Sequence, residues 1–274
     1  MAKKSCTGIP GCVLACLTLV IIVLILGVLI FPLVNRSDEE ARKTQCRSNL
    51  GVIGVALSAY AADNGGYLPP IAPEAFQASK ESGVPAGSYL VIPTSPDNAV
   101  KTGLGFLWPN YLASYGLWAP IFYCPSQCIA DEKWNGVFSF DRDEPFWTSK
   151  GKIIRGNGNG KGDVPWDNIH GEIITNYTLR PAQPDANWKL DKMGRKALAS
   201  DVMILRPSGW DKPIYQNHLG TYNVLYGDGR VIEYKDTDHE VAKRLAGAGS
   251  VDEIVLKIFE EVFDRFYVPD DKRG

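Results

Sequence analysis

The sequence predicts an α+β protein. A long N-terminal transmembrane helix forms a spine that packs on a head with a small antiparallel β-sheet, and a C-terminal amphipathic helix follows. Three observations predict this class: an uncharged apolar run at 13–34, a hairpin pattern at 222–234 and a four-residue apolar repeat at 254–266. A chain of 274 residues is long enough to build one good core beside such a spine.

The apolar run at 13–34 is interrupted only by Pro32. A bilayer core needs about 20 apolar residues in a helix. The run is longer than the apolar region of a cleaved signal peptide, and no small-residue cleavage pattern follows it. A lipoprotein reading around Cys16 is the weaker alternative. We therefore predict a transmembrane helix at 13–34, after a short N-terminal segment at 1–12; the charges on either side of the run leave its orientation open.

The helical pattern continues beyond the apolar run, and we predict a continuation of the helix over 35–64. Apolar side chains recur at spacings of three and four, which places them on one face of a helix. These residues are Leu50, Ile53, Leu57 and Tyr60. The segment Asp63-Asn64-Gly65-Gly66 is typical of a helix C-terminus, so the helix is expected to end there.

The following segment, 65–235, is predicted to form the globular head. Its first part, 70–170, is rich in glycine and proline, and we expect only short helices within 80–95 and 103–115. Surface loops are expected at 141–144 and 156–162. The second loop is rich in glycine, but its residues do not fit the spacing of a phosphate-binding loop.

Strand patterns begin near residue 173. We predict strands at 173–179 and 197–205, and a hairpin whose strands at 222–226 and 230–234 flank an Asp-Gly turn. Consecutive strands joined by tight turns form an antiparallel sheet.

A C-terminal helical extension is predicted over 236–274. Ser250 and Glu253 have the spacing of a capping box at the start of a helix. The apolar positions that follow are Ile254, Ile258, Val262 and Phe266. Packing of this face on the head's own sheet is the favoured interpretation, and docking of a partner protein is the alternative.

The charge balance argues against a nucleic-acid partner. The net charge is -2 and the isoelectric point is about 6.0, whereas nucleic-acid-binding domains are strongly basic. Seven Trp and twelve Tyr residues are mainly expected to pack in cores and interfaces, with glycan contact as an alternative.

Three cysteines lie beyond the apolar run: Cys46, Cys124 and Cys128. A disulfide is the default for an exported domain, and both Cys124–Cys128 and Cys46–Cys124 are conceivable pairs. The C-x3-C spacing has no second knuckle, so it does not indicate a zinc ribbon.

No catalytic residue is predicted. The three histidines belong to no metalloprotease motif, and no G-x-S-x-G motif is present. His218 and Asp228 are expected at opposite ends of a strand about 17 Å long, so they should not form a dyad, although Asp201 could approach either. No cofactor is predicted; a calcium site is a weaker alternative, with oxygen donors from several loop acids. These acids are Asp141, Asp143, Asp163, Asp167 and Asp228.

Several motifs of the chain resemble those of bacterial type IV pilin-like proteins and type II secretion pseudopilins. His218 is followed at a spacing of ten by Asp228-Gly229, which is similar to the H-x9-DG module of a bacterial subgroup of these proteins. The helix motif is similar as well, as are the short motifs at 124–126 and 199–201. The residues that carry the resemblance are Cys46, Asn49, Leu50, Tyr60, Asp63, Asn64, Tyr67, Pro69, Cys124, Asp201, His218, Asp228 and Gly229.

The resemblance implies a non-enzymatic structural protein, anchored in the bacterial inner membrane by a single pass. Its N-terminus at 1–12 would be cytoplasmic, and the continuation of the helix at 35–64 would be exoplasmic. Its head would lie in the periplasm or exoplasmic space, and its partners would be the lipid bilayer and other membrane-protein subunits, met through the anchor helix. Two alternatives remain: an accessory subunit of another membrane complex, docking through its head or C-terminal helix, and a module that binds glycan or calcium.

The N-terminus departs from the family pattern. An ungapped alignment on Pro32 and Cys46 places the first mature residue at Gly11, preceded by Pro10 instead of the family's glycine. The family's glutamate near the mature N-terminus corresponds to Ala15. This departure argues against peptidase processing and fibre assembly and favours an unprocessed, permanently anchored accessory subunit, whereas the head motifs favour a minor or divergent pseudopilin.

Overall fold

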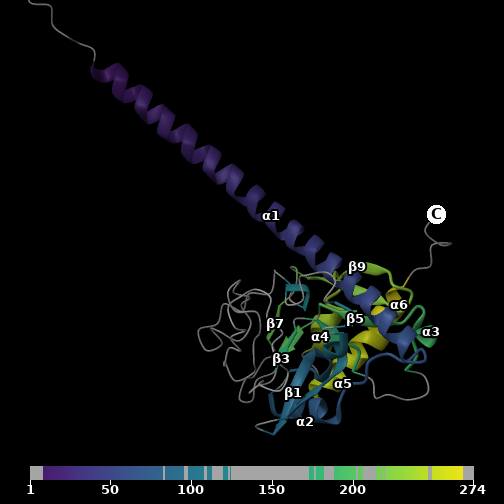
Figure 1. Cartoon of the computed structure of the whole chain (residues 1–274). Coiled ribbons are helices and arrows are strands. Elements are labelled where there is room, and N and C mark those ends of the chain that lie inside the picture. Colours follow the sequence, from purple (N-terminus) through teal and green to yellow (C-terminus); the bar gives the residue numbers. More distant parts are fainter. Residues whose placement is uncertain are drawn as a thin grey trace, which may run out of the picture. The chain divides into compact units, whose positions relative to one another are not determined.

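The computed structural model describes most of the chain outside the segment 125–172 (Figure 1). The described residues are 9–82, 84–95, 98–107, 110–112, 120–122, 124, 173–175, 177–181, 188–201, 203–205, 214–216, 218, 220–245 and 249–267. The chain divides into two units, Met1–Ala41 and Arg42–Gly274. The predicted loops at 141–144 and 156–162 lie outside the described residues.

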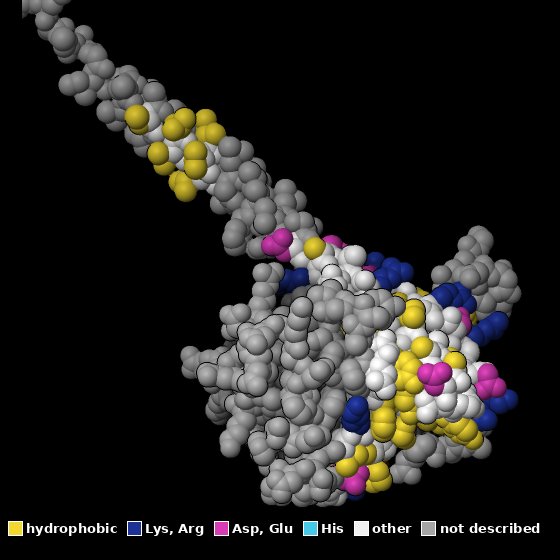
Figure 2. Space-filling model, viewed as in Figure 1, with side chains coloured by type: hydrophobic (Ala, Val, Ile, Leu, Met, Phe, Trp, Pro, Cys, Tyr) yellow, Lys and Arg dark blue, Asp and Glu magenta, His cyan; other side chains and the backbone are white. Residues whose placement is uncertain are grey.

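The first unit contains the beginning of helix α1 (Ile9–Asp63). No helix among the described residues combines the length and the apolar character that crossing a bilayer requires. In the stretch 13–34 the described side chains are Cys16 and residues 19–24, all of them exposed (Figure 2). Because no described helix meets the requirement for crossing a bilayer, the predicted transmembrane spine is wrong.

The same finding corrects the predicted location. A single pass through the bacterial inner membrane, with the N-terminus inside and the head in the periplasm, requires a spanning helix. None of the described helices meets the requirement for spanning a membrane. The anchor predicted at 13–34 is therefore wrong as well.

The second unit begins within α1, and this part of the helix packs on the head. Leu50, Ile53 and Leu57 are fully buried, which agrees with the apolar face that the sequence indicates. The helix ends at Asp63, and the Asn64 side chain donates a hydrogen bond to the Tyr60 carbonyl oxygen at 2.8 Å. This side chain satisfies one of the carbonyl groups left open at a helix C-terminus.

The centre of the head is a four-stranded antiparallel sheet with the order β4-β5-β8-β9. Its strands are β4 (Thr178–Leu179), β5 (Ala197–Ser200), β8 (Thr221–Tyr226) and β9 (Val231–Lys235). The predicted hairpin is present as β8 and β9. At its turn Gly229 has a φ of 83°, a left-handed conformation that glycine adopts without strain.

Alternate residues of β8 face two different layers. Tyr222, Val224 and Tyr226 lie in one apolar cluster with the C-terminal helices, whereas Leu225 belongs to the cluster that contains the buried face of α1. Helix α1 approaches strand β8 closely at Gly54, where an added Cβ atom would lie 2.8 Å from Leu225 Cδ1. The sheet is therefore covered by α1 on one face and by the C-terminal helices on the other.

Two smaller antiparallel sheets complete the described strands. One has the order β2-β1-β3, and the other pairs β6 with β7. Their strands are β1 (Tyr89–Ser95), β2 (Asn98–Lys101), β3 (Ile173–Ile174), β6 (Met203–Leu205) and β7 (Ile214–Gln216). The sequence predicts one strand at 173–179 and one at 197–205, but each is divided between two sheets.

Short helices connect these sheets. They are α2 (Pro73–Ser82), η1 (Ala86–Ser88), η2 (Gly103–Leu107), η4 (Pro120–Phe122) and α3 (Leu190–Met193). The short helix predicted within 80–95 is present as η1, which lies between the end of α2 at Ser82 and the start of β1 at Tyr89. Proline and glycine between these two residues stop α2.

The C-terminal segment is helical, as the sequence predicts. It contains α4 (Glu240–Leu245), α5 (Val251–Ile258), the π-helical turn η6 (Phe259–Phe263) and α6 (Asp264–Phe266), shown in yellow-green and yellow in Figure 1. The capping box is present, since Ser250 and Glu253 exchange backbone-to-side-chain hydrogen bonds. Arg180, which is buried, donates hydrogen bonds to both carboxylate oxygens of Asp264 and so ties this segment to the strand β4.

Candidate functional site: a buried cysteine, histidine and aspartate cluster

A disulfide joins α1 to the loop that follows η4. It links Cys46 and Cys124, which are 78 residues apart in the chain, and both residues are buried. The sequence left two pairings open, and this is the one present in the structure. Cys128, which belongs to the other pairing, lies outside the described residues.

The His218 side chain lies against this disulfide. Its Nε2 atom is 3.2 Å from Cys124 Sγ and 3.3 Å from Asp201 Oδ2. His218 is 2% exposed and Asp201 is 0% exposed, so solvent barely reaches the pair. Asp201, which the sequence allowed to approach either His218 or Asp228, contacts His218.

Asp201 lies where the chain leaves β5, and the strand β8 holds its carboxylate. The backbone N–H of Asn223 donates to Asp201 Oδ1 at 2.8 Å, and the Asn223 side-chain amide donates to Oδ2 at 2.7 Å. In return, the Asp201 N–H donates to the Asn223 carbonyl oxygen. These bonds replace regular strand pairing at Asp201, which explains why the predicted strand at 197–205 is interrupted there.

Asn49 lies one helical turn after Cys46 and faces the same region. Its side-chain amide donates a hydrogen bond to the Tyr177 hydroxyl at 3.2 Å, and Gln45 donates to the Asn49 side-chain oxygen at 2.8 Å. Burial raises the pKa of Tyr177 far above its usual range, and the nearby Asp201 charge adds to the increase. The phenol therefore stays neutral and acts as a hydrogen-bonding group in the core.

The other motif residues of α1 stabilise the head in different ways. Leu50 is part of the apolar core. Tyr60 packs edge-on against Tyr111, with 5.6 Å between the ring centroids, and the Tyr111 hydroxyl donates to Asp63 at 3.1 Å. Together with Asn64 at the helix terminus, these residues fix the end of α1.

Asp228 and Gly229 belong to the hairpin turn and not to the cluster. His218 precedes β8 and Asp228 follows it, so the two residues lie at opposite ends of this strand, as the sequence indicates. Asp228 Oδ2 is 2.7 Å from an Arg230 guanidinium nitrogen and accepts a 2.7 Å hydrogen bond from the Tyr267 hydroxyl. The two ends of the H-x9-DG motif therefore lie in different parts of the fold: His218 in the buried cluster, and Asp228 and Gly229 in the hairpin turn.

Asp228 does not support the calcium alternative, because Arg230 and Tyr267 bind its carboxylate. The remaining acids of that alternative lie outside the described residues. They are Asp141, Asp143, Asp163 and Asp167.

The docking face proposed for the C-terminal helix is largely covered by the protein itself. Ile254, Ile258 and Val262 are buried in the cluster that packs on β8 and β9. Phe266 remains 36% exposed, and its ring contacts Tyr234 with a centroid distance of 4.8 Å. The structure therefore assigns this face to the core of the head.

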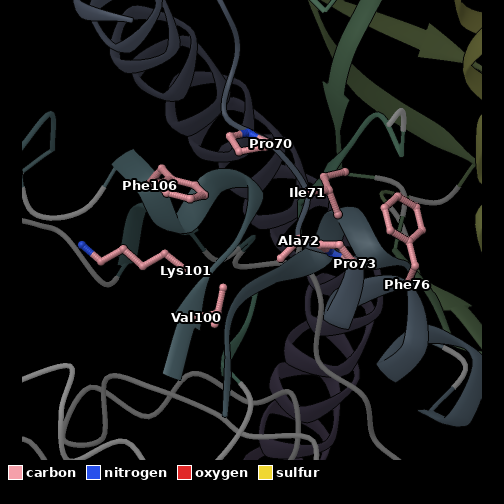
Figure 3. A pocket seen from close by; sticks show the side chains of 8 residues that line it. All are labelled: Pro70, Ile71, Ala72, Pro73, Phe76, Val100, Lys101 and Phe106. Atoms are coloured by element: carbon pink, nitrogen blue, oxygen red, sulfur yellow. The ribbon is translucent and has the colours of Figure 1, made fainter. Parts of the chain in front are cut away.

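A separate apolar pocket opens between α2, β2 and η2 (Figure 3). Its volume is about 370 Å³, and its lining residues are Pro70, Ile71, Ala72, Pro73, Phe76, Val100, Lys101 and Phe106. Lys101 supplies the charge in this lining, and partial burial lowers its pKa. Neither a carboxylate nor a histidine is among these lining residues, so the pocket offers no acid–base pair.

Sequence reasoning missed two positioning residues, Asn223 and Tyr177. A signal for Asn223 exists, because it is a polar residue inside the otherwise apolar and aromatic strand 222–226. The strand alternation places it on the face of Leu225, opposite Tyr222 and Val224. An asparagine at such a position needs a buried hydrogen-bond partner, and Asp201 supplies it.

Four side chains of three chemical types thus meet in one buried place: Cys46, Cys124, Asp201 and His218. In the oxidised state they form a disulfide beside an imidazole–carboxylate pair. Such an arrangement connects segments and excludes water. Comparison of the chain with protein-family models, with curated proteins and with solved structures finds no match.

Proposed function

We propose that this chain is a non-enzymatic structural subunit of a pilin-like or pseudopilin-like assembly. The observation that carries the proposal is the buried cluster of Cys46, Cys124, Asp201 and His218. These residues belong to the motifs that resemble the pilin-like family, and each is bound within the head. Their role is to hold the helix α1 on the sheet.

Burial supports the non-enzymatic part of the proposal. A catalytic histidine and carboxylate must come within hydrogen-bond reach of a substrate. His218 and Asp201 are 2% and 0% exposed, and the neighbouring sulfurs share a disulfide bond. Histidine and aspartate in this arrangement stabilise a packed interior.

The uncovered face of α1 supports the assembly part of the proposal. Within the head unit, Leu50, Ile53 and Leu57 are buried against the sheet, whereas Val55 on the opposite side is 59% exposed. Small residues accompany Val55 on this exposed side: Ser48, Ser58, Ala59 and Ala62. Small side chains let another helix approach closely.

Site-specific photo-crosslinking in cells that make the full chain tests this proposal. A photoreactive amino acid at Val55 is expected to give products at multiples of the chain's own mass, or products joined to another pilin-like chain. The matched control is the same amino acid at Lys192, an exposed position on α3. Uncrosslinked monomer at Val55, or equal crosslinking at both positions, would contradict the proposal.

A further inference from the structure

Four potential metal ligands come together from four separate segments of the head. Cys46 comes from α1, Cys124 follows η4, Asp201 follows β5 and His218 precedes β8. One ligand atom from each residue lies within 4.8 Å of the others, and all four residues are buried. Two sulfurs, one imidazole nitrogen and one carboxylate oxygen make a complete ligand set for a tetrahedral zinc ion.

The distances suit such an ion once the disulfide is open. With Zn–S near 2.3 Å and Zn–N or Zn–O near 2.0 Å, a tetrahedral site places its ligand atoms about 3.3–3.8 Å apart. The Nε2 atom of His218 already lies 3.3 Å from Asp201 Oδ2 and 3.2 Å from Cys124 Sγ. Two changes complete the geometry: the two sulfurs separate once the bond between them is lost, and ligand atoms that lie up to 4.8 Å apart close around the ion.

Surrounding hydrogen bonds hold the two ligands that do not change covalently. Asn223 donates two hydrogen bonds to the Asp201 carboxylate. The backbone at His218 is fixed because its carbonyl oxygen accepts from both the hydroxyl and the N–H of Thr221. Ligands of protein metal sites are characteristically oriented by such outer hydrogen bonds.

We infer that this cluster is a redox-gated zinc site. A dithiol reductant gives two hydrogens to the disulfide, becomes a disulfide itself and leaves Cys46 and Cys124 as thiols. Zn²⁺ then binds both sulfurs as thiolates, together with neutral His218 and the Asp201 carboxylate, and two protons leave for solvent. The ion restores the connection between α1 and the sheet that the disulfide provides in the oxidised state.

The ligand chemistry selects zinc over calcium. Thiolate sulfur is a soft ligand that suits zinc, whereas calcium binds oxygen ligands only. This inference does not depend on the proposed assembly role, since it concerns the interior of one chain.

The test uses the full-length chain in which Cys6, Cys12, Cys16 and Cys128 are serine, so that Cys46 and Cys124 supply the only sulfur ligands of this type. Zinc binding is measured by calorimetry before and after reduction with a phosphine, which becomes the phosphine oxide and competes weakly for zinc. We expect no binding to the oxidised protein and one ion per reduced chain. Titrations in two buffers of different ionisation enthalpy should report release of about two protons per ion.

Two substitutions distinguish a four-ligand zinc site from zinc binding by the two thiols alone. In the reduced protein, His218→Ala and Asp201→Asn are each expected to weaken zinc binding by at least about 10-fold. The matched control is His239→Asn, because His239 is exposed and remote in sequence from the cluster ligands. Cobalt is the second probe, and its visible spectrum should show tetrahedral sulfur ligation that changes in the His218 variant.

Each result of these zinc titrations supports or overturns the inference. Should reduction unfold the head, recovery of native circular dichroism on addition of one equivalent of zinc would support the inference. Failure of zinc to bind the reduced chain, whether folded or unfolded, overturns it. Binding of equal strength in the His218→Ala, Asp201→Asn and control proteins also overturns it, since two thiols alone would then explain the affinity.

Discussion

At the scale of single residues, the head depends on a few side chains that connect distant segments. Cys46 and Cys124 link α1 to the loop after η4, and Asp201 and His218 pack against that link. These contacts join segments that are far apart in sequence, and the disulfide alone spans a separation of 78 residues. The residues therefore act mainly on the stability of the assembled head.

Removal of the disulfide gives a prediction at this scale. The double variant Cys46→Ala/Cys124→Ala should lose about 4 kcal/mol of unfolding free energy, because the link closes a long loop in the unfolded chain. Denaturant unfolding without reductant measures the change. The control is Cys16→Ser, whose side chain is exposed and unbonded as a free cysteine, and it should leave the free energy unchanged. Equal midpoints for the two variants would contradict the prediction.

At the scale of elements, the C-terminal helices are a structural layer of the head. Their apolar repeat faces β8 and β9, and aromatic side chains fill the contact, with Phe263 packed edge-on against Tyr234 at 5.5 Å between ring centroids. Arg180 adds a buried charged contact to the same helices through Asp264. The amphipathic pattern therefore encodes a fold contact rather than a free docking surface.

Truncation of two positions on the same helical face tests this assignment. Ile258→Ala should lower the unfolding free energy by about 3 kcal/mol, because it empties a fully buried site. Phe266→Ala removes a larger side chain from a partly exposed site, and we expect a loss of about 1 kcal/mol. Denaturant unfolding of both variants measures these losses. A larger loss of unfolding free energy for Phe266→Ala than for Ile258→Ala would show that this face does not pack as described.

The N-terminus of α5 carries a pH-dependent contact. Burial raises the pKa of Asp252, while the hydrogen bond that its Oδ1 accepts from the Ala86 N–H lowers it. Because the net shift is upward, the folded protein binds this proton more tightly than the unfolded chain. The resulting stabilisation is fully present below the ordinary aspartate pKa of about 3.9 and is lost as pH rises through the raised folded value.

Comparison with Asp252→Asn isolates this effect, since other titrating groups are shared by both proteins. The unfolding free energy of the wild-type protein relative to the variant should fall as the pH rises from the ordinary aspartate pKa of about 3.9 through the raised folded pKa. Unfolding free energies measured across this range provide the check. A difference that is constant, or that grows with pH, would mean that the folded pKa is not raised.

At the scale of the whole molecule, the unit Arg42–Gly274 contains the described apolar core. Cys46 is the first core residue along the chain, and Leu50, Ile53 and Leu57 follow on the same helix. The residues before Arg42 supply none of the buried side chains that the structure describes. The head should therefore fold without them.

A pair of fragments tests this independence. Fragment 42–274 should unfold cooperatively with a free energy within about 0.5 kcal/mol of the full chain, because its core is complete. Fragment 58–274 lacks Cys46, Leu50, Ile53 and Leu57, and should not reach the native circular dichroism signal. Loss of cooperative unfolding in the longer fragment would show that residues before Arg42 are part of the head.

The sequence by itself determined the elements whose signals are local. The hairpin at 222–234 follows from its Asp-Gly turn, the start of α5 from a capping box, and the end of α1 from Asp63-Asn64-Gly65-Gly66. In each case neighbouring residues supply both the pattern and the bonds. The apolar stretch at 13–34 predicts a membrane span from an equally local pattern, but no described helix meets the requirement for one.

The tertiary structure decided what depends on residues far apart in the chain. Two cysteine pairings were open because separation in sequence does not fix distance in space; packing of α1 on the sheet brought Cys46 to Cys124. The strand expected at 197–205 was divided because Asp201 bonds to Asn223 across the sheet, and this interaction also positions His218. The cluster exists only where four segments meet, and its chemistry is therefore a property of the folded head.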